Sequence, residues 1–297
     1  MKKGNAVAWT AERNRLADFF ALTKPRLNSL TVTTAGVGYF LGATSPIDLL
    51  MMLHVLIGSG LVAGGAAAFN QVAERDIDET MARTRLRPMP MGHVSPNEGR
   101  IFAVIIAIAG LAILLVGTNV VAAIVAATTL VSYVAIYTPL KRRTSWATII
   151  GAVPGALPPV IGWTAARGAL TIEAWVLFSI VFLWQLPHFH ALSWLYRSDF
   201  KKSGLPLIAV QDPDGRRTAK HALFFGCALV PVSLTPTFVG LAGLPYLVLA
   251  TVLGVAFLIL AVRFLSERTD ARARVLFLGS LVYLSLLWVS LVSARLL

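Results

Sequence analysis

The sequence is far more apolar than that of a soluble protein of the same length. Hydrophobic residues make up 57% of its 297 residues, charged residues only 13%, the net charge is +12 and the mean hydropathy is +0.74. A soluble domain carries roughly 25% charged residues, and a chain with half that share would expose too much apolar surface to stay dissolved. Composition therefore excludes a disordered chain, an ordinary cytosolic enzyme and, with one cysteine, a disulfide scaffold. It predicts an all-α polytopic membrane protein.

Nine apolar segments approach the length needed to cross a membrane, which is about 20 mostly apolar residues. They cover residues 27–44, 48–70, 101–117, 119–137, 147–166, 173–195, 221–240, 245–264 and 275–294. The third is short, and its separation from the fourth depends on Gly117 and Asn119. We expect residues 1–26 to form a cytoplasmic tail and residues 27–297 to form a bundle of nine transmembrane helices around an intramembrane cavity.

The basic residues fall almost entirely on one side of these segments. All but two of the 26 Lys and Arg residues lie in the N-terminal tail or in alternate loops, and the exceptions are Arg167 and Arg295. Positively charged loops stay in the cytoplasm, so the N-terminus and these loops are expected inside and the C-terminus outside. Because topology accounts for the net charge, we expect no nucleic acid partner.

Acidic side chains gather where the second segment ends. Asn70, Glu74 and Asp78 are spaced four residues apart, which places them on one face if the helix continues past the membrane. Like charges at this spacing destabilise a helix, and a bound cation offsets that cost. Mg²⁺ binds carboxylate oxygens and usually keeps phosphate and water as its other ligands. The pattern indicates either a cradle for Mg²⁺ and a polyphosphate or a solvated acidic helix end.

The residues that follow in the same loop are strongly basic. Arg83, Arg85 and Arg87 lie within five residues, close to the acidic cluster. Guanidinium groups bind oxyanions through paired hydrogen bonds, so the three suit a ligand with several negative charges. The general excess of positive charge in cytoplasmic loops explains them equally well.

A second group of polar residues ends the sixth segment. Gln185, His188 and His190 lie beside Pro187, and such groups are costly inside a membrane unless they line a cavity or find partners. A structural role for the histidines and a role in a site are both open at this point. The segment 147–166 carries six glycine and proline residues, which favours a kinked helix that borders a cavity or packs closely.

These stretches together resemble the UbiA superfamily of intramembrane prenyltransferases. Residues 70–88 are similar to its first diphosphate-binding motif, and residues 196–206 resemble the second. Further similar stretches are residues 22–26, 137–144, 158–163 and 184–189. The last of these, Trp-Gln-Leu-Pro-His-Phe, is typical of the branch that farnesylates heme. Glu74 stands where the superfamily usually has Asp, which keeps the charge but lengthens the side chain.

The resemblance implies a reaction, a cofactor and a set of site residues. Members of that branch join farnesyl diphosphate to a vinyl group of heme B, add water and release diphosphate to give heme O. The implied cofactor is Mg²⁺, and its implied ligands, which are also the catalytic residues, are Asn70, Glu74, Asp78 and Asp199. The implied diphosphate-binding residues are Arg83, Arg87, Lys141, Arg142 and Lys202. His188 is the candidate for contact with heme, as an iron ligand or as part of the pocket wall.

The resemblance also implies a setting for the reaction. The expected location is the cytoplasmic (inner) membrane of a bacterium, where membrane lipid surrounds the bundle. A heme A synthase that consumes the product is an implied partner.

Two other functions remain open. A UbiA-type prenyltransferase with another aromatic or tetrapyrrole acceptor would share the first motif but is not expected to carry the Pro-His-Phe stretch. A secondary transporter would account for a broken fifth helix, but it is expected to keep ionisable residues near mid-membrane. In this sequence the acidic residues gather at one face.

Overall fold

A computed structural model describes residues 14–44 and 46–296, so residues 1–13 of the predicted tail lie outside the described part. Within that part every regular element is helical. The long helices are α2 (Pro25–Gly42), α3 (Leu49–Ala73), α5 (Pro96–Gly117), α6 (Val120–Val131), α10 (Ile172–Leu195), α12 (Arg216–Phe238), α13 (Leu244–Glu267) and α14 (Asp270–Leu296). A π-helix, η1 (Ser132–Tyr137), and α7 (Thr138–Leu140) continue α6, and α8 (Ala147–Ala156) is followed by α9 (Pro158–Arg167). The short elements are α1 (Arg15–Leu22), α4 (Arg75–Thr80), α11 (Arg197–Lys202) and the 3₁₀ helix η2 (Ile208–Val210).

Each of the nine predicted segments is helical, and α5 ends at Gly117 where a break was expected. Eight of the nine are long and apolar enough to cross a membrane. The remaining one, α2, has 18 residues but is more polar than the others. It packs against α3 and α9, and a helix shielded by neighbours needs less apolar surface of its own. The fold of a polytopic helical membrane protein is thus confirmed, while the number of nine spans stays a prediction.

The expected interruption of the fifth segment lies between α8 and α9. Leu157 separates the two helices, and α9 begins with Pro158. The glycines nearby allow α2 and α9 to touch backbone to backbone. A Cβ atom on Gly162 would lie 1.9 Å from the carbonyl oxygen of Ala35, and one on Gly38 would lie 2.0 Å from that of Pro159. Small residues at such crossings are the usual means of close helix packing in membranes.

We therefore expect Gly162→Ala to destabilise the bundle by about 1–3 kcal/mol, because the added methyl overlaps a backbone oxygen that cannot move aside. Gly226→Ala in α12 is the matched control, since its Cβ would meet no heavy atom closer than 3.5 Å. Thermal unfolding of the two variants in detergent, followed by size-exclusion chromatography, measures the difference. Equal midpoints for the two variants would contradict the packing argument.

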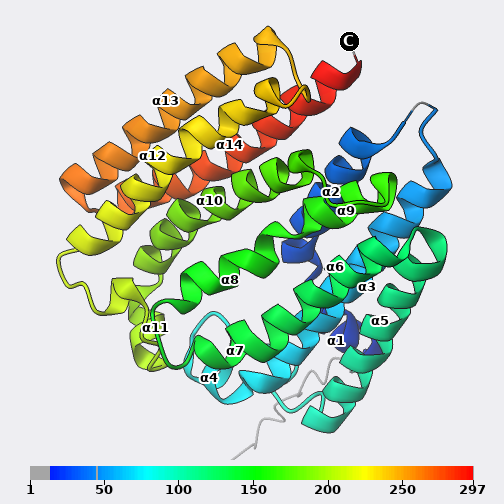
Figure 1. Ribbon diagram of the computed structural model, residues 1–297. Coiled ribbons are helices and arrows are strands. Elements are labelled where there is room, and N and C mark those ends of the chain that lie inside the picture. The colour runs from blue at the N-terminus through cyan, green and yellow to red at the C-terminus, as the bar shows by residue number, and fades with distance from the viewer. Residues whose placement is uncertain (1–13, 45, 297) are drawn as a thin grey trace, which may run out of the picture.

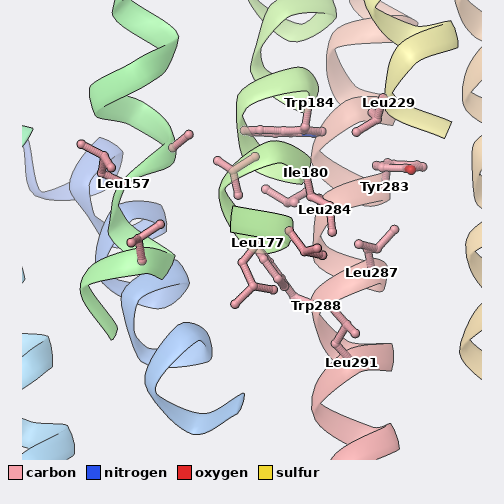
Figure 2. Packing of buried hydrophobic residues seen from close by; sticks show 14 of the residues in the cluster. Leu157, Leu177, Ile180, Trp184, Leu229, Tyr283, Leu284, Leu287, Trp288 and Leu291 are labelled. Atoms are coloured by element: carbon pink, nitrogen blue, oxygen red, sulfur yellow. The ribbon is translucent and has the colours of Figure 1, made fainter. Parts of the chain in front are cut away.

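The largest core cluster joins α10 to α14 and α12. Figure 2 shows Ile180 of α10 and Leu284 of α14 between the two helices, with Leu287 on the other side of α14, all of them buried. The contact continues toward the far end of α14. This packing fixes the wall on which the second polar group of the sequence lies.

The described end of the predicted tail is helical. Residues 15–22 form α1, which packs its buried Leu22 against α3 and α5 and leaves Leu16 and Phe20 exposed. The amide of Gln71 donates to the Leu22 carbonyl at 2.8 Å. The segment that leads into α2 is therefore held against the bundle.

Candidate active site

The two polar groups singled out in the sequence face a single cavity. The short elements α4, α7 and α11 gather at one end of the bundle (Figure 1). A cavity of about 620 Å³, here called the central cavity, lies against them, and its lining includes Asn70, Glu74, Asp78, Gln185 and His188. Its volume falls in the range of ligand sites, roughly 300–1,000 Å³.

The acidic group lies at the junction of α3 and α4. The helix is interrupted at Glu74, the residue between the two elements. Helical hydrogen bonds nevertheless continue, because the Glu74 N–H donates to the Asn70 carbonyl at 2.9 Å and the Asp78 N–H donates to the Glu74 carbonyl at 2.8 Å. The three side chains are 3% exposed or less and line the central cavity together. The predicted common face is confirmed, and a solvated helix end is excluded.

Both buried carboxylates are paired with cations. Lys141 Nζ donates to the two carboxylate oxygens of Glu74 at 3.0 and 3.1 Å. Arg87 Nη1 donates to Asp78 Oδ2 at 2.7 Å. Lys141 and Arg87 also line the central cavity, so each of these two predicted diphosphate-binding residues lies where it can reach an anion beside the carboxylates.

Lys24 is a site residue that the sequence reasoning missed. Its Nζ donates to Asn70 Oδ1 at 2.9 Å, and the residue lines the central cavity. Its φ of 49° is left-handed, which is uncommon for a residue other than glycine. Burial and the nearby charge of Arg87 lower the pKa of Lys24 to about 7. An anion bound beside Lys24 would offset the repulsion from the neighbouring cations and stabilise the charged form of the lysine. The sequence feature that could have identified Lys24 is its position in residues 22–26, a stretch similar to one in the superfamily.

Arg83 links the two polar loops. Its guanidinium lies 5.0 Å from the ring centre of Tyr196 and 5.9 Å from that of Phe200. Ile77 and Met81 pack in one cluster with Phe200. The loop after α4 and the helix α11 therefore cover the same end of the central cavity, and Arg83 lines it.

Three predicted site residues are not among those that line the central cavity. Arg142 donates to both carboxylate oxygens of Asp76 at 2.7 and 3.1 Å and to the Ala73 carbonyl, and this pairing lowers the pKa of Asp76. Arg142 thus holds the α3–α4 junction from outside. Lys202 is exposed and Asp199 is half-buried, both in α11. The structure does not bring these three together with the acidic group, and their predicted roles stay predictions.

Two tyrosines form part of the wall next to Lys141. Tyr133 and Tyr137 lie on the π-helix η1, with ring centres 5.2 Å apart. Short π-helical turns are frequent at functional sites. The Tyr133 carbonyl accepts hydrogen bonds from both the backbone N–H of Thr138 and its hydroxyl, the latter at 2.9 Å. A Cβ on Gly151 would lie 2.5 Å from the Tyr137 ring, which explains a glycine at this point of α8.

His188 is held in one orientation by its neighbours. Its ring stacks on Trp184 with centres 5.0 Å apart and lies 4.6 Å from the ring of Phe277. Its Nδ1 lies 2.7 Å from the hydroxyl of Ser280, and that hydroxyl donates its one proton to the Phe277 carbonyl at 2.6 Å. The Ser280 oxygen therefore accepts from Nδ1–H, which leaves the lone pair of the neutral imidazole on Nε2.

The donor set of the acidic group fits a hard divalent cation. Two carboxylates and an amide oxygen are buried on one cavity wall, and oxygen ligands are those that Mg²⁺ and similar ions prefer. The described residues contain no group of three or more His, Cys, Asp or Glu side chains that could enclose a metal ion by themselves. Such an ion would need further oxygen ligands, and the oxygens of a bound diphosphate would supply them.

A sequence model of the UbiA prenyltransferase family matches residues 30–289. The chain belongs to this family. A protoheme IX farnesyltransferase of Solibacter usitatus is 46% identical over 282 residues, which cover 92% of this chain and 97% of that protein. One of Opitutus terrae is 42% identical, with 96% and 97% covered. Within the family the chain groups with the protoheme IX farnesyltransferases.

Solved structures share the fold at low identity. A digeranylgeranylglyceryl phosphate synthase has a TM-score of 0.80 at 18% identity, with 95% of this chain and 99% of that chain covered. A UbiA homologue from Archaeoglobus fulgidus bound to GPP and Mg²⁺ has a TM-score of 0.68 at 14% identity, with 93% and 99% covered. These likenesses establish a UbiA fold for the chain.

Proposed function

We propose that this protein transfers the farnesyl group of farnesyl diphosphate to a vinyl group of heme B, with addition of water, to give heme O and diphosphate. One observation carries the proposal: the cation-paired acidic group and the aromatic wall around His188 border the same cavity. The high identity to protoheme IX farnesyltransferases supports the choice of heme as the acceptor.

The diphosphate would bind at the polar end of the central cavity. Mg²⁺ is the proposed metal, with Asn70, Glu74 and Asp78 as ligands, and when bound it would neutralise charge on the diphosphate. Lys24 and Lys141 lie against these same ligands and can turn to the diphosphate oxygens. Their charge would stabilise the anion as the bond between the farnesyl C1 and the diphosphate oxygen breaks.

Arg83 and Arg87 are proposed to bind the outer oxygens of the same diphosphate. Both line the cavity at its covered end. Asp199 is also proposed as a ligand of Mg²⁺, and Arg142 and Lys202 are proposed as further groups that bind the diphosphate. Asp199 and Lys202 lie on α11, which would have to shift to bring them into the cavity.

The departing diphosphate leaves an allylic farnesyl cation, which the cavity must protect from water. Tyr133 and Tyr137 supply aromatic faces beside the acidic group, and such faces stabilise cations. The deeper wall is apolar and aromatic, with Trp184, Phe189 and Phe277. The vinyl group of heme then attacks farnesyl C1, and a water molecule adds to the resulting cation beside the porphyrin and loses a proton.

His188 is proposed to ligate the heme iron through Nε2, because Ser280 occupies its Nδ1. Ser280→Ala should weaken heme binding by roughly 10–100-fold and shift the Soret band, since the partner that orients a ligating histidine is removed. Ser280→Thr keeps the hydroxyl and should retain most of the affinity. Absorbance titration with heme, alongside KM and kcat, separates this from a packing defect: an unchanged spectrum and KM in Ser280→Ala would contradict the role.

The setting of the reaction is also proposed. The charge distribution of the loops supports a cytoplasmic location for the N-terminus and the polar end of the cavity, with the C-terminus outside, in the cytoplasmic (inner) membrane of a bacterium. A heme A synthase would be the partner that consumes the product.

The proposal is tested by a product assay. Membranes that contain the protein are incubated with heme B, farnesyl diphosphate and Mg²⁺, and the extracted hemes are analysed by liquid chromatography and mass spectrometry. A heme heavier by one farnesyl group and one water, absent after EDTA and restored by Mg²⁺, is the expected result. Unchanged heme B in the presence of an active control enzyme would overturn the choice of acceptor.

A further inference from the structure

A second cavity, of about 610 Å³ and here called the lateral groove, lies beside α12. The residues of α12 that line it are Arg217, Lys220, His221, Phe224 and Phe225. Their spacing of three and four residues makes one continuous stripe along the helix. The stripe is cationic near the start of α12 and aromatic further along. It therefore suits a ligand with an anionic edge and an apolar body.

The opposite wall adds a second histidine. It is built from Trp146, which precedes α8, from Thr148 in the first turn of α8, and from His190 of α10. His190 is 2% exposed, its Nε2 has no hydrogen-bond partner in the described part of the chain, and its ring centre lies 5.4 Å from that of His221. Thr148 lines both the lateral groove and the central cavity, so the two cavities are neighbours.

The cations of the lateral groove are unpaired within the part of the chain that the structure describes. Neither Arg217 nor Lys220 pairs with a carboxylate among the described residues. The two are three residues apart on an exposed face, which matches a ligand with two neighbouring carboxylates. A neutral imidazole is a common axial ligand for a metal in a planar macrocycle, and two imidazoles lie at this groove.

We propose that the lateral groove binds a metalloporphyrin, as a second tetrapyrrole site next to the central cavity. The carboxylates of the porphyrin lie on Arg217 and Lys220, and its ring lies between Trp146 and the aromatic residues of α12. His190 or His221 contacts the metal. The choice of a porphyrin as ligand rests on the proposed function, while the groove and its chemistry do not.

An anionic lipid headgroup is the rival occupant. It would account for the two cations and for the exposed Trp146 and Phe224, which lie where aromatic residues often meet a membrane surface. It would not account for the two histidines. A buried imidazole without a partner is costly in such a place, and a lipid headgroup on the exposed cations would not relieve it.

The test is a binding titration with iron mesoporphyrin, which lacks vinyl groups and cannot be prenylated. The detergent-purified full-length protein is titrated by Soret difference absorbance. We expect two porphyrins per chain for the wild type, and binding at the lateral groove at least tenfold weaker in Arg217→Gln/Lys220→Gln. Arg263→Gln/Arg274→Gln removes two exposed cations outside the groove and should still bind two. His190→Phe should change the Soret position of one bound porphyrin only.

The outcomes separate this inference from the proposed function. If the central cavity takes no porphyrin, the wild type binds one, and Arg217→Gln/Lys220→Gln abolishes it. A wild type that binds one porphyrin with unchanged affinity in Arg217→Gln/Lys220→Gln and in His190→Phe overturns the inference and leaves the proposed function intact. Native mass spectrometry measures the phosphatidylglycerol that stays bound to each variant. If Arg217→Gln/Lys220→Gln loses this lipid while its porphyrin binding is unchanged, the groove is a lipid site and the inference is overturned.

Discussion

Asp78→Ala should lower the rate of heme O formation by roughly a hundredfold to a thousandfold, while the protein remains in the membrane. Asp78 is 1% exposed and pairs with Arg87 at the wall of the central cavity. Its removal takes away a proposed ligand of Mg²⁺ and leaves the position of Arg87 unfixed. Product formation measured by mass spectrometry at saturating substrate gives kcat directly. Asp78→Asn, which keeps the shape of the side chain, should be nearly as inactive.

Asp76→Ala is the matched control for this prediction. Asp76 lies on the same short helix, but its side chain is 71% exposed and pairs with Arg142 outside the cavity. We expect its loss to reduce the rate by less than about fivefold, because an exposed ion pair contributes about 1 kcal/mol at most. Wild-type activity in Asp78→Asn, or equal loss in the two alanine variants, would refute the assignment of Asp78 to the site.

Lys24→Met should raise the KM for farnesyl diphosphate by roughly 10–100-fold, the equivalent of one or two charge-assisted hydrogen bonds. Methionine keeps the length and apolar stem of lysine, so the packing of the chain before α2 is preserved. The charge that reaches Asn70 at 2.9 Å is lost. Initial rates at varied farnesyl diphosphate and fixed heme B measure the effect.

Arg26→Met provides the comparison for Lys24→Met. Arg26 is exposed on the first turn of α2 and is not among the residues that line the central cavity. Its loss should leave the KM within about twofold, because a solvated charge outside the cavity is screened. If both variants raised the KM equally, the effect would reflect the overall charge of the cytoplasmic face and not a contact of Lys24.

Much of the architecture could be predicted from the sequence because membrane helices leave a strong local signal. The predicted segments agree with the observed helices within a few residues, and α3 ends at Ala73, shortly after the end of the predicted segment 48–70. Local spacing also placed Asn70, Glu74 and Asp78 on one face. The helical hydrogen bonds through Glu74 preserve that face although the helix is interrupted there. The amphipathic α1 was not predicted, because a helix of eight residues is too short to leave a clear apolar period in a charged tail.

The contacts between distant residues could not be predicted in this way. Lys24 and Asn70 are 46 residues apart, and Lys141 and Glu74 are 67 apart. Which basic residue meets which acidic residue depends on how the helices pack. Arg142, next to Lys141, turns instead to Asp76 outside the central cavity. No spacing rule distinguishes the two neighbours.

The sequence by itself determined the membrane class, the family resemblance and the two polar groups, because hydropathy, charge bias and motif spacing are local properties of the chain. Only the tertiary structure decided that these groups share one cavity, that Lys24 belongs to it and that Ser280 orients His188 from a helix without any motif. The physical reason is that burial and ion pairing are set by helix packing. That packing follows from contacts such as those of Gly162 with Ala35, which join segments more than a hundred residues apart.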